Sequence, residues 1–253
     1  MAVPKIALGK PAAYGQEIVK RRFRLTAATV ALSGKTVLDF GCGNGAQTCE
    51  FAQTGSQIFA VDLAFADLQT LRQQLERQHL ASIIPLQYDG SHLPMASGSF
   101  DLVLSFEVLE HVHDEATVLS EWRRVLKPNG EIVISVPNKG WIFETHGANL
   151  RGLPWHRVPF FSYLPHFLHR RLARARIYRR RDIVQLLQKH AFEVLRTEYI
   201  MAPLDVVKTP WLKRLLQASV FRGDTTRCSI FATAILVHAR KISPPHETNK
   251  IAS

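Results

Sequence analysis

The sequence predicts an α/β protein built on a doubly wound, mostly parallel β-sheet. Short apolar segments alternate with amphipathic segments of helical periodicity from residue 35 to residue 138, as they do where a helix connects each pair of parallel strands. Glycine occupies alternate positions directly after the first apolar segment, at Gly41, Gly43 and Gly45, which indicates a tight turn from strand to helix. The 253 residues are 46% hydrophobic, enough to bury one substantial core, so disordered and fibrous classes are excluded.

One helix precedes this alternating core, and further elements follow it. The predicted elements are a helix over 14–32, strands over 35–39 and 58–62 with a helix over 48–53 between them, a helix over 67–79, strands over 83–88 and 100–105, a helix over 116–126, a strand over 131–136, a helix over 182–190, a strand over 192–199, a helical link over 211–221 and a strand over 228–238. The first helix either packs on the domain edge or forms a lid over the ligand.

Polar side chains stand where the first four strands end. These residues are Asp39, Asp62, Asp89 and Ser105. In a doubly wound sheet the ligand lies beyond the carboxyl ends of the strands, so all four are expected near it. Asp62 follows the glycine turn by about twenty residues, the spacing at which a carboxylate at a strand end accepts the hydroxyls of a ribose.

The glycine turn alone does not identify the ligand. Unpaired amide groups at the start of a helix favour an electron-rich ligand of several kinds. Gly41, Gly43 and Ala46 also satisfy the dinucleotide-binding fingerprint. A nicotinamide or flavin oxidoreductase is therefore an alternative at this point.

The charge of the chain is unevenly distributed. Residues 35–138 contain 6 Lys and Arg against 13 Asp and Glu, a balance of −7, so the net charge of +11 leaves +18 for the remainder. Residues 151–181 contain nine arginines and no acid. This block favours an anionic partner, namely nucleic acid, an acidic membrane surface or a phosphorylated substrate, with a solvated basic face as the alternative.

The expected location is the cytoplasm, with peripheral contact to a membrane as an option. No segment has the features of a signal peptide or a transmembrane helix. The cysteines Cys42, Cys49 and Cys228 are odd in number and lack metal-ligand spacing, which is typical of free thiols in a reducing compartment.

Six blocks of the core carry a family resemblance. They are Leu38-Asp39-Phe40-Gly41-Cys42-Gly43-Asn44-Gly45, Val61-Asp62, Asp89 with Leu93-Pro94, Phe100-Asp101-Leu102-Val103, Leu109-Glu110-His111-Val112 and Leu126-Lys127-Pro128-Asn129-Gly130-Glu131. In order and spacing they resemble the class I S-adenosylmethionine-dependent methyltransferases, and more narrowly the small-molecule branch with the ubiquinone and menaquinone biosynthesis methyltransferases. The resemblance implies a Rossmann-like seven-stranded sheet whose last strand is antiparallel. It also implies methyl transfer from S-adenosyl-L-methionine, with S-adenosyl-L-homocysteine as product, to an oxygen or carbon of a small, lipophilic or aromatic acceptor.

The resemblance also implies which residues hold the cofactor. Its methionine part would lie against Gly41, Gly43 and Gly45, its amino group near Asp39, and its ribose hydroxyls at Asp62 with Leu63 beside it. The adenine edge would meet Asp89 and Gly90, and the sulfonium would lie beside Ser105 and Phe106.

A hydroxyl acceptor would also need a base, and histidine titrates near neutral pH. His111 is the first candidate because it follows the fourth strand at the mouth of the expected pocket, and His146 is the second. Glu107, Glu110 and His111 together resemble a divalent-cation site of some quinone O-methyltransferases. The same residues serve loop and helix packing elsewhere in the family, so we expect no metal.

The region that follows residue 138 lacks strand periodicity and is rich in aromatic residues, prolines and arginines. It predicts an inserted cap, where related enzymes build their acceptor pockets. Its basic segment 151–181 suits an anionic membrane that carries a lipid acceptor, and it would also suit RNA. A small molecule is favoured because no recognisable RNA-binding module is appended.

The expected organisation has five parts: a helical lid over 1–34, the cofactor-binding core over 35–138, the cap over 139–181, the C-terminal part of the same Rossmann-like domain over 182–240, and a flexible tail over 241–253. Two alternative functions stay open within the family. One is an RNA or protein methyltransferase that uses the basic cap, and the other is a non-catalytic member that binds the cofactor only.

Overall fold

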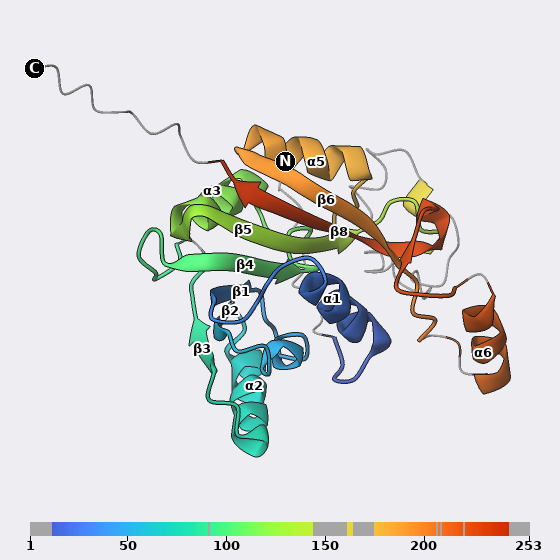
Figure 1. The fold of residues 1–253 in the computed structure, drawn as a ribbon, viewed down its shortest axis with the longest axis horizontal. Helices are drawn as coiled ribbons and strands as arrows, with labels where there is room; N and C mark the ends of the chain where they lie inside the picture. The colour runs from blue at the N-terminus through green and yellow to red at the C-terminus, as the bar shows by residue number, and fades with distance from the viewer. Residues whose placement is uncertain are drawn as a thin grey trace, which may run out of the picture.

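The fold is that of a computed structural model, which describes residues 12–90, 92–143, 161–163, 175–205, 207, 209–219 and 221–242 (Figure 1). Its elements in chain order are α1 (Glu17–Ala27), β1 (Thr36–Phe40), the 3₁₀ turn η1 (Thr48–Phe51), β2 (Gln57–Asp62), α2 (Phe65–Gln78), β3 (Ile83–Gln87), β4 (Phe100–Phe106), α3 (Glu115–Val125), β5 (Leu126–Pro137), η3 (Phe161–Tyr163), α5 (Arg180–Lys189), β6 (Phe192–Met201), α6 (Pro210–Ala218), β7 (Thr225–Thr226), η4 (Ser229–Phe231) and β8 (Ala232–Lys241).

The strands form one sheet in the order β3-β2-β1-β4-β5-β8-β6-β7. The first five strands of this order pair in parallel, while β8 lies antiparallel between β5 and β6. The predicted fold class, including an antiparallel last strand, is confirmed. The described sheet has eight strands and not seven, because the two-residue β7 adds to the edge of β6.

Helices cover both faces of the sheet, and each face has its own core (Figure 1). On one face α3 and α5 pack against the strands through Trp122 and Leu187, which are fully buried. On the other face α1, η1 and α2 pack through residues that include Phe51 and Leu71. Apolar residues therefore flank the sheet on both sides, as parallel strands require.

Several boundaries differ from the prediction for local reasons. The helix predicted over 14–32 begins at Glu17, after Gly15 with a φ of 75°, and ends at Ala27. The helix predicted over 48–53 is a single 3₁₀ turn of four residues. The strand predicted over 131–136 already begins at Leu126, which pairs with Phe100 as soon as α3 ends. The final strand starts at Ala232 and not at residue 228, because residues 229–231 form a 3₁₀ turn.

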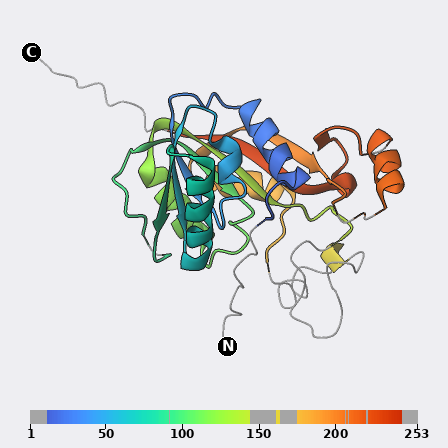
Figure 2. The same cartoon turned by 90° about the horizontal axis from the view of Figure 1, so that it is seen from below.

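The predicted cap over 139–181 and the tail over 241–253 lie largely outside the described residues. Within the described parts of the cap, Tyr163 donates to the carbonyl of Gly140 at 2.8 Å. Tyr178 attaches the cap to the core, because it forms a parallel bridge with Asn138. From below, α1 lies between α2 and α6, and α6 stands at the end of the molecule away from α2 (Figure 2). No helix in the described ranges is long and apolar enough to span a membrane.

Candidate functional site

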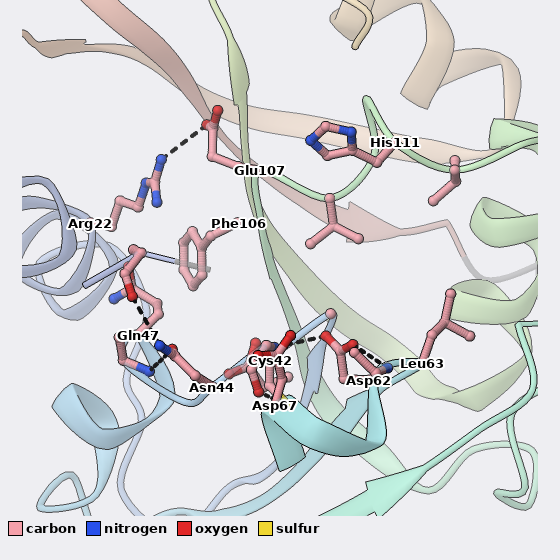
Figure 3. Close-up of a pocket in the computed structure, with 18 of the residues that line it drawn as sticks. Arg22, Cys42, Asn44, Gln47, Asp62, Leu63, Asp67, Phe106, Glu107 and His111 are labelled. Carbon is pink, nitrogen blue, oxygen red and sulfur yellow. Dashed lines mark hydrogen bonds and ion pairs between the residues drawn. The ribbon is translucent and has the colours of Figure 1, made fainter. Parts of the chain in front are cut away.

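A cavity of about 870 Å³ lies at the carboxyl ends of the parallel strands. It runs from the glycine turn after β1 and the end of β2 to the segment that follows β4 (Figure 3). Of the residues predicted for the site, eight line it: Asp39, Gly41, Gly43, Asp62, Leu63, Gly90, Phe106 and His111. The structure therefore brings together residues that are up to 72 positions apart, Asp39 and His111.

The glycine turn is tightly built. Gly41 and Gly43 have φ values of 76° and 53°, in the left-handed region that favours glycine. The amides of Gly41 and Cys42 both donate to the carbonyl of Val61, at 2.8 and 3.0 Å, which ties the turn to the end of β2. A Cβ on Gly41 would stand 2.4 Å from Cγ2 of Val108. The turn and the segment after β4 are thus packed so closely that only glycine fits between them.

We expect Gly41→Ala to lower the free energy of unfolding by about 2 kcal/mol, because it combines a strained φ with the contact to Val108. Urea unfolding measures this change. Gly98→Ala is the matched control, since Gly98 also has a positive φ, 69°, but a Cβ there would meet nothing within 4 Å. The control should cost about 1 kcal/mol. Equal costs for the two variants would show that the contact with Val108 is unimportant.

Asp62 stands at the end of β2 and fixes two loops at once. One carboxylate oxygen accepts the amide of Gly43 at 2.7 Å, and the other accepts the amide of Ala64 at 2.9 Å. Each oxygen keeps a second lone-pair direction for another donor. Asp62 is therefore held in one orientation on the cavity wall, with acceptor capacity left for a ligand.

Asp39 lies deeper, at the end of β1. It is 2% exposed and accepts a hydrogen bond from the Thr48 hydroxyl at 2.6 Å. Burial raises the pKa of Asp39 to about 7, the Thr48 hydrogen bond opposes this shift, and the charge of Asp62 adds to it. A cationic group beside Asp39 would lower this pKa again, so the site is suited to a positive charge.

Three predicted residues lie outside the cavity lining. Gly45 packs against α2, where a Cβ would stand 2.2 Å from Cδ1 of Leu71. Asp89 is exposed and accepts the amide of His92 at 3.5 Å, while its neighbour Tyr88 lines the cavity instead. Ser105 is fully buried within β4. Their expected contacts with a ligand are not supported by these positions.

The other end of the cavity is formed by residues after β4. Glu107 has a φ of 58° and pairs with Arg22 of α1 at 3.1 Å, a contact visible in Figure 3. Ser135 donates to the same carboxylate at 3.0 Å. The side chain of His111 is 9% exposed, and its Nε2 stands 4.0 Å from the carboxylate of Glu110.

Glu110 is one of the three residues, with Glu107 and His111, that resemble a divalent-cation site. It is completely buried, and burial together with the nearby charge of Glu107 raises its pKa well above the usual range. A carboxyl group held protonated is a poor cation ligand. Among the described residues no group of three or more His, Cys, Asp or Glu is arranged to hold a metal ion.

The N-terminal segment packs over the glycine turn, on the side where the sequence predicts a lid, but the hydrogen bonds that hold it there could not be predicted from the sequence. Tyr14 donates to the carbonyl of Asn44, the side-chain amide of Asn44 donates to Ala12 at 3.3 Å, and Gln47 donates to the carbonyl of Val19 at 3.1 Å. These bonds fasten the segment and α1 over one side of the cavity. His146, the second candidate base, lies outside the described residues.

The comparisons with known proteins agree with this geometry. Residues 38–134 match the family model described as a methyltransferase domain. A ubiquinone biosynthesis O-methyltransferase of Acinetobacter baylyi is 33% identical over 129 residues, which cover 49% of this chain and 54% of that protein. The corresponding protein of Pseudomonas paraeruginosa is 37% identical over 123 residues, 46% of this chain and 52% of its own length. The chain thus matches about half the length of these relatives.

The similarity in structure covers more of the chain than the similarity in sequence does. A solved S-adenosylmethionine-dependent methyltransferase of Mesorhizobium loti superimposes with a TM-score of 0.59 at 20% identity, covering 86% of this chain and 96% of that structure. At this level of identity the likeness concerns the fold.

Proposed function

We propose that this chain is a class I S-adenosylmethionine-dependent methyltransferase, which transfers a methyl group from S-adenosyl-L-methionine to an oxygen or carbon of a small-molecule acceptor. The observation that carries the proposal is the position of Asp62. Its carboxylate is fixed by the amides of Gly43 and Ala64 at the wall of the cavity, at the strand end where a ribose is bound in such folds.

The residues present suit this cofactor in charge and shape. Asp62 would accept the ribose hydroxyls, and Asp39 would lie near the positively charged amino group. The bare backbone of Gly41 and Gly43 would let the methionine part approach closely. Tyr88 and Leu63 offer apolar surface where the adenine would lie, in place of the exposed Asp89.

S-Adenosylmethionine supplies a methyl group that is already activated on a positively charged sulfur. The chain's own residues therefore have to align the acceptor and exclude water. Arg22 and Ile18 of α1 line the cavity beside Phe106, and the pair Arg22–Glu107 joins α1 to the segment after β4. In the proposed mechanism α1 closes this side of the site during transfer.

For a hydroxyl acceptor we propose His111 as the group that takes the proton. Its imidazole lines the cavity on the side away from the glycine turn, where the acceptor would enter (Figure 3). Val108, Val112 and Val118 add apolar surface nearby, which suits an aromatic or lipophilic acceptor. The names of the relatives point in the same direction, since those proteins methylate an oxygen in quinone biosynthesis.

Calorimetric titration with S-adenosylhomocysteine and, in parallel, with NADH tests the cofactor. We expect micromolar binding of S-adenosylhomocysteine and no binding of NADH. A screen of phenolic and quinone-like acceptors with radiolabelled S-adenosylmethionine then tests the transfer, and His111→Ala should lower kcat with little change in cofactor affinity. Binding of NADH alone would overturn the proposal, whereas cofactor binding without transfer to any small molecule would point to a non-catalytic role or a macromolecular acceptor.

A further inference from the structure

Helix α6 carries an apolar face that the protein covers only in part. Trp211 and Leu215 are 68% and 59% exposed, and they lie four residues apart, on the same side of the helix. Leu212 and Leu216 stand beside them along the helix and are half-buried. Exposed aromatic and aliphatic side chains adjoining on one helix are unusual for a surface that faces only water.

The surroundings of α6 are basic. Residues 206–223 contain four Lys and Arg, Lys208, Lys213, Arg214 and Arg222, and no Asp or Glu. Arg214 and Arg222 are exposed, and so is Arg227 nearby. The first acid after the helix, Asp224, accepts two hydrogen bonds from Arg24 of α1, at 2.6 and 2.7 Å. Its charge is therefore balanced by α1. Residues 206–223 themselves contain no acid, and Asp205 is the acid that directly precedes them.

The segment between β6 and β7, which carries α6, stands at one end of the molecule (Figures 1 and 2). Its two ends, at Met201 and Asp224, form the base and are held together. The amide of Met201 donates to the carbonyl of Asp224 at 2.9 Å, which closes the base. Arg21 donates to the carbonyl of Met201 at 2.7 Å and so ties the base to α1. Pro203 and Asp205, at the start of the segment, line the cavity. The apolar face of α6 thus begins at Trp211, six residues after a residue that lines the cavity.

We propose that α6 lies on the surface of an anionic lipid bilayer and brings the mouth of the cavity to it. Trp211 and Leu215 enter the boundary between headgroups and acyl chains, and Arg214 and Arg222 contact lipid phosphates. The helix is about 13 Å long, too short to cross a bilayer but sufficient to lie along it. The inference rests on the proposed function, because a lipophilic acceptor would be drawn from the membrane.

The composition of the face favours a bilayer over RNA. Single-stranded nucleic acid is bound by several aromatic side chains on which successive bases stack. Here one tryptophan stands among leucines, and aliphatic side chains offer acyl chains a better surface than they offer bases. The basic residues attract the negative surface charge of the membrane from outside the apolar stripe.

Flotation of the full chain with vesicles tests the proposal. Vesicles of equal parts phosphatidylglycerol and phosphatidylcholine should bind the protein, and pure phosphatidylcholine should bind it weakly. W211S/L215S should lower binding to the anionic vesicles at least about tenfold, because two exposed apolar side chains leave the interface. Arg214→Gln should lower it about fivefold, equivalent to about 1 kcal/mol for one basic residue at the surface.

Leu195→Ser is the matched control, since Leu195 is also exposed, at 39%, but lies on β6. The control should bind vesicles as the unchanged protein does. Unchanged vesicle binding by W211S/L215S would overturn the proposal and leave the arginine-rich segment 151–181 as the contact. A dimer that is lost in W211S/L215S would assign the face to a second copy, and loss of binding to a single-stranded RNA oligonucleotide in that variant would assign it to nucleic acid.

The two proposals can fail separately. Affinity for S-adenosylhomocysteine should be the same in W211S/L215S and in the unchanged protein, since neither residue lines the cavity. Vesicle binding without any affinity for S-adenosylhomocysteine would contradict the methyltransferase and keep the docking surface. Affinity for S-adenosylhomocysteine without vesicle binding would contradict the docking surface and leave the methyltransferase proposal standing.

Discussion

Replacing Asp62 with alanine should weaken the binding of S-adenosylhomocysteine by at least about 100-fold. The variant loses the acceptor for the ribose hydroxyls, and it also leaves the amides of Gly43 and Ala64 without their carboxylate partner. Hydrogen bonds to a charged group contribute about 1.5–3 kcal/mol each, so loss of one ligand contact and of the loop's support accounts for this change. Calorimetric titration at pH 8 measures the affinity directly.

Asp67→Ala is the matched control for Asp62→Ala. Asp67 also lines the cavity, so this substitution removes the same charge five residues away on α2. Among the hydrogen bonds of the described residues, none runs from an amide of the glycine turn to the Asp67 carboxylate. We therefore expect a loss below about fivefold, from long-range electrostatics. Similar losses in the two variants would mean that the negative potential of the cavity, and not the position of Asp62, decides the affinity.

The affinity for S-adenosylhomocysteine should rise about tenfold for each pH unit up to about pH 7 and then level off. Asp39 has a pKa of about 7 in the ligand-free protein because it is buried. If the ligand's ammonium group lies beside it, binding requires the ionised carboxylate and releases one proton below pH 7. From pH 5 to pH 7 the affinity should rise roughly 50-fold, because the carboxylate is half ionised at pH 7.

Titrations in buffers of different ionisation enthalpy count the protons released and so check this prediction. In Asp39→Asn the affinity should be lower at pH 8 and independent of pH. The sign for stability is opposite: the folded pKa lies above the ordinary value of 3.8, so without ligand the folded protein holds a proton that the unfolded chain loses. The contribution of Asp39 to stability should therefore fall as the pH rises from about 4 to about 7. A pH-independent affinity in the unchanged protein would place the ammonium group away from Asp39.

The parts of the site that the sequence predicted follow from strand ends. Gly41, Gly43, Asp39 and Asp62 come directly after or at the ends of two adjacent parallel strands, so their place at one edge follows from topology alone. The third glycine was assigned to the ligand, whereas in the structure Gly45 makes room for Leu71 of α2. Sequence spacing does not distinguish a glycine that a ligand approaches from one that a helix approaches.

The end of β3 differs from the prediction by one residue. The strand was predicted to end at Tyr88 but ends at Gln87, so the alternation of side chains stops one residue earlier. Tyr88 therefore faces the cavity, and Asp89 points to solvent. Tyr88 is therefore the residue of this pair that lines the cavity, while contact between Asp89 and the adenine stays a prediction.

Features that depend on contacts between residues far apart in the chain could not be predicted from the sequence. Arg22 and Glu107 are 85 positions apart and pair only because α1 packs beside the segment after β4. The two-residue β7 has no apolar periodicity, and it forms because β6 offers an open edge. Both are set by tertiary contacts and not by local preference.

The insertion of β8 between β5 and β6 has a consequence for the order in which the protein can be assembled. β8 is made after both of its neighbours, yet it joins them, pairing with β5 on one side and β6 on the other. Until residues 232–241 leave the ribosome, β5 and β6 cannot belong to one continuous sheet. Because β8 runs antiparallel, its first residues also reach the cavity, where Thr233 and Ala234 complete the wall. A nascent chain therefore carries an open, incomplete binding site until this late strand is in place, and its half-built sheet exposes strand edges that newly made chains must keep apart.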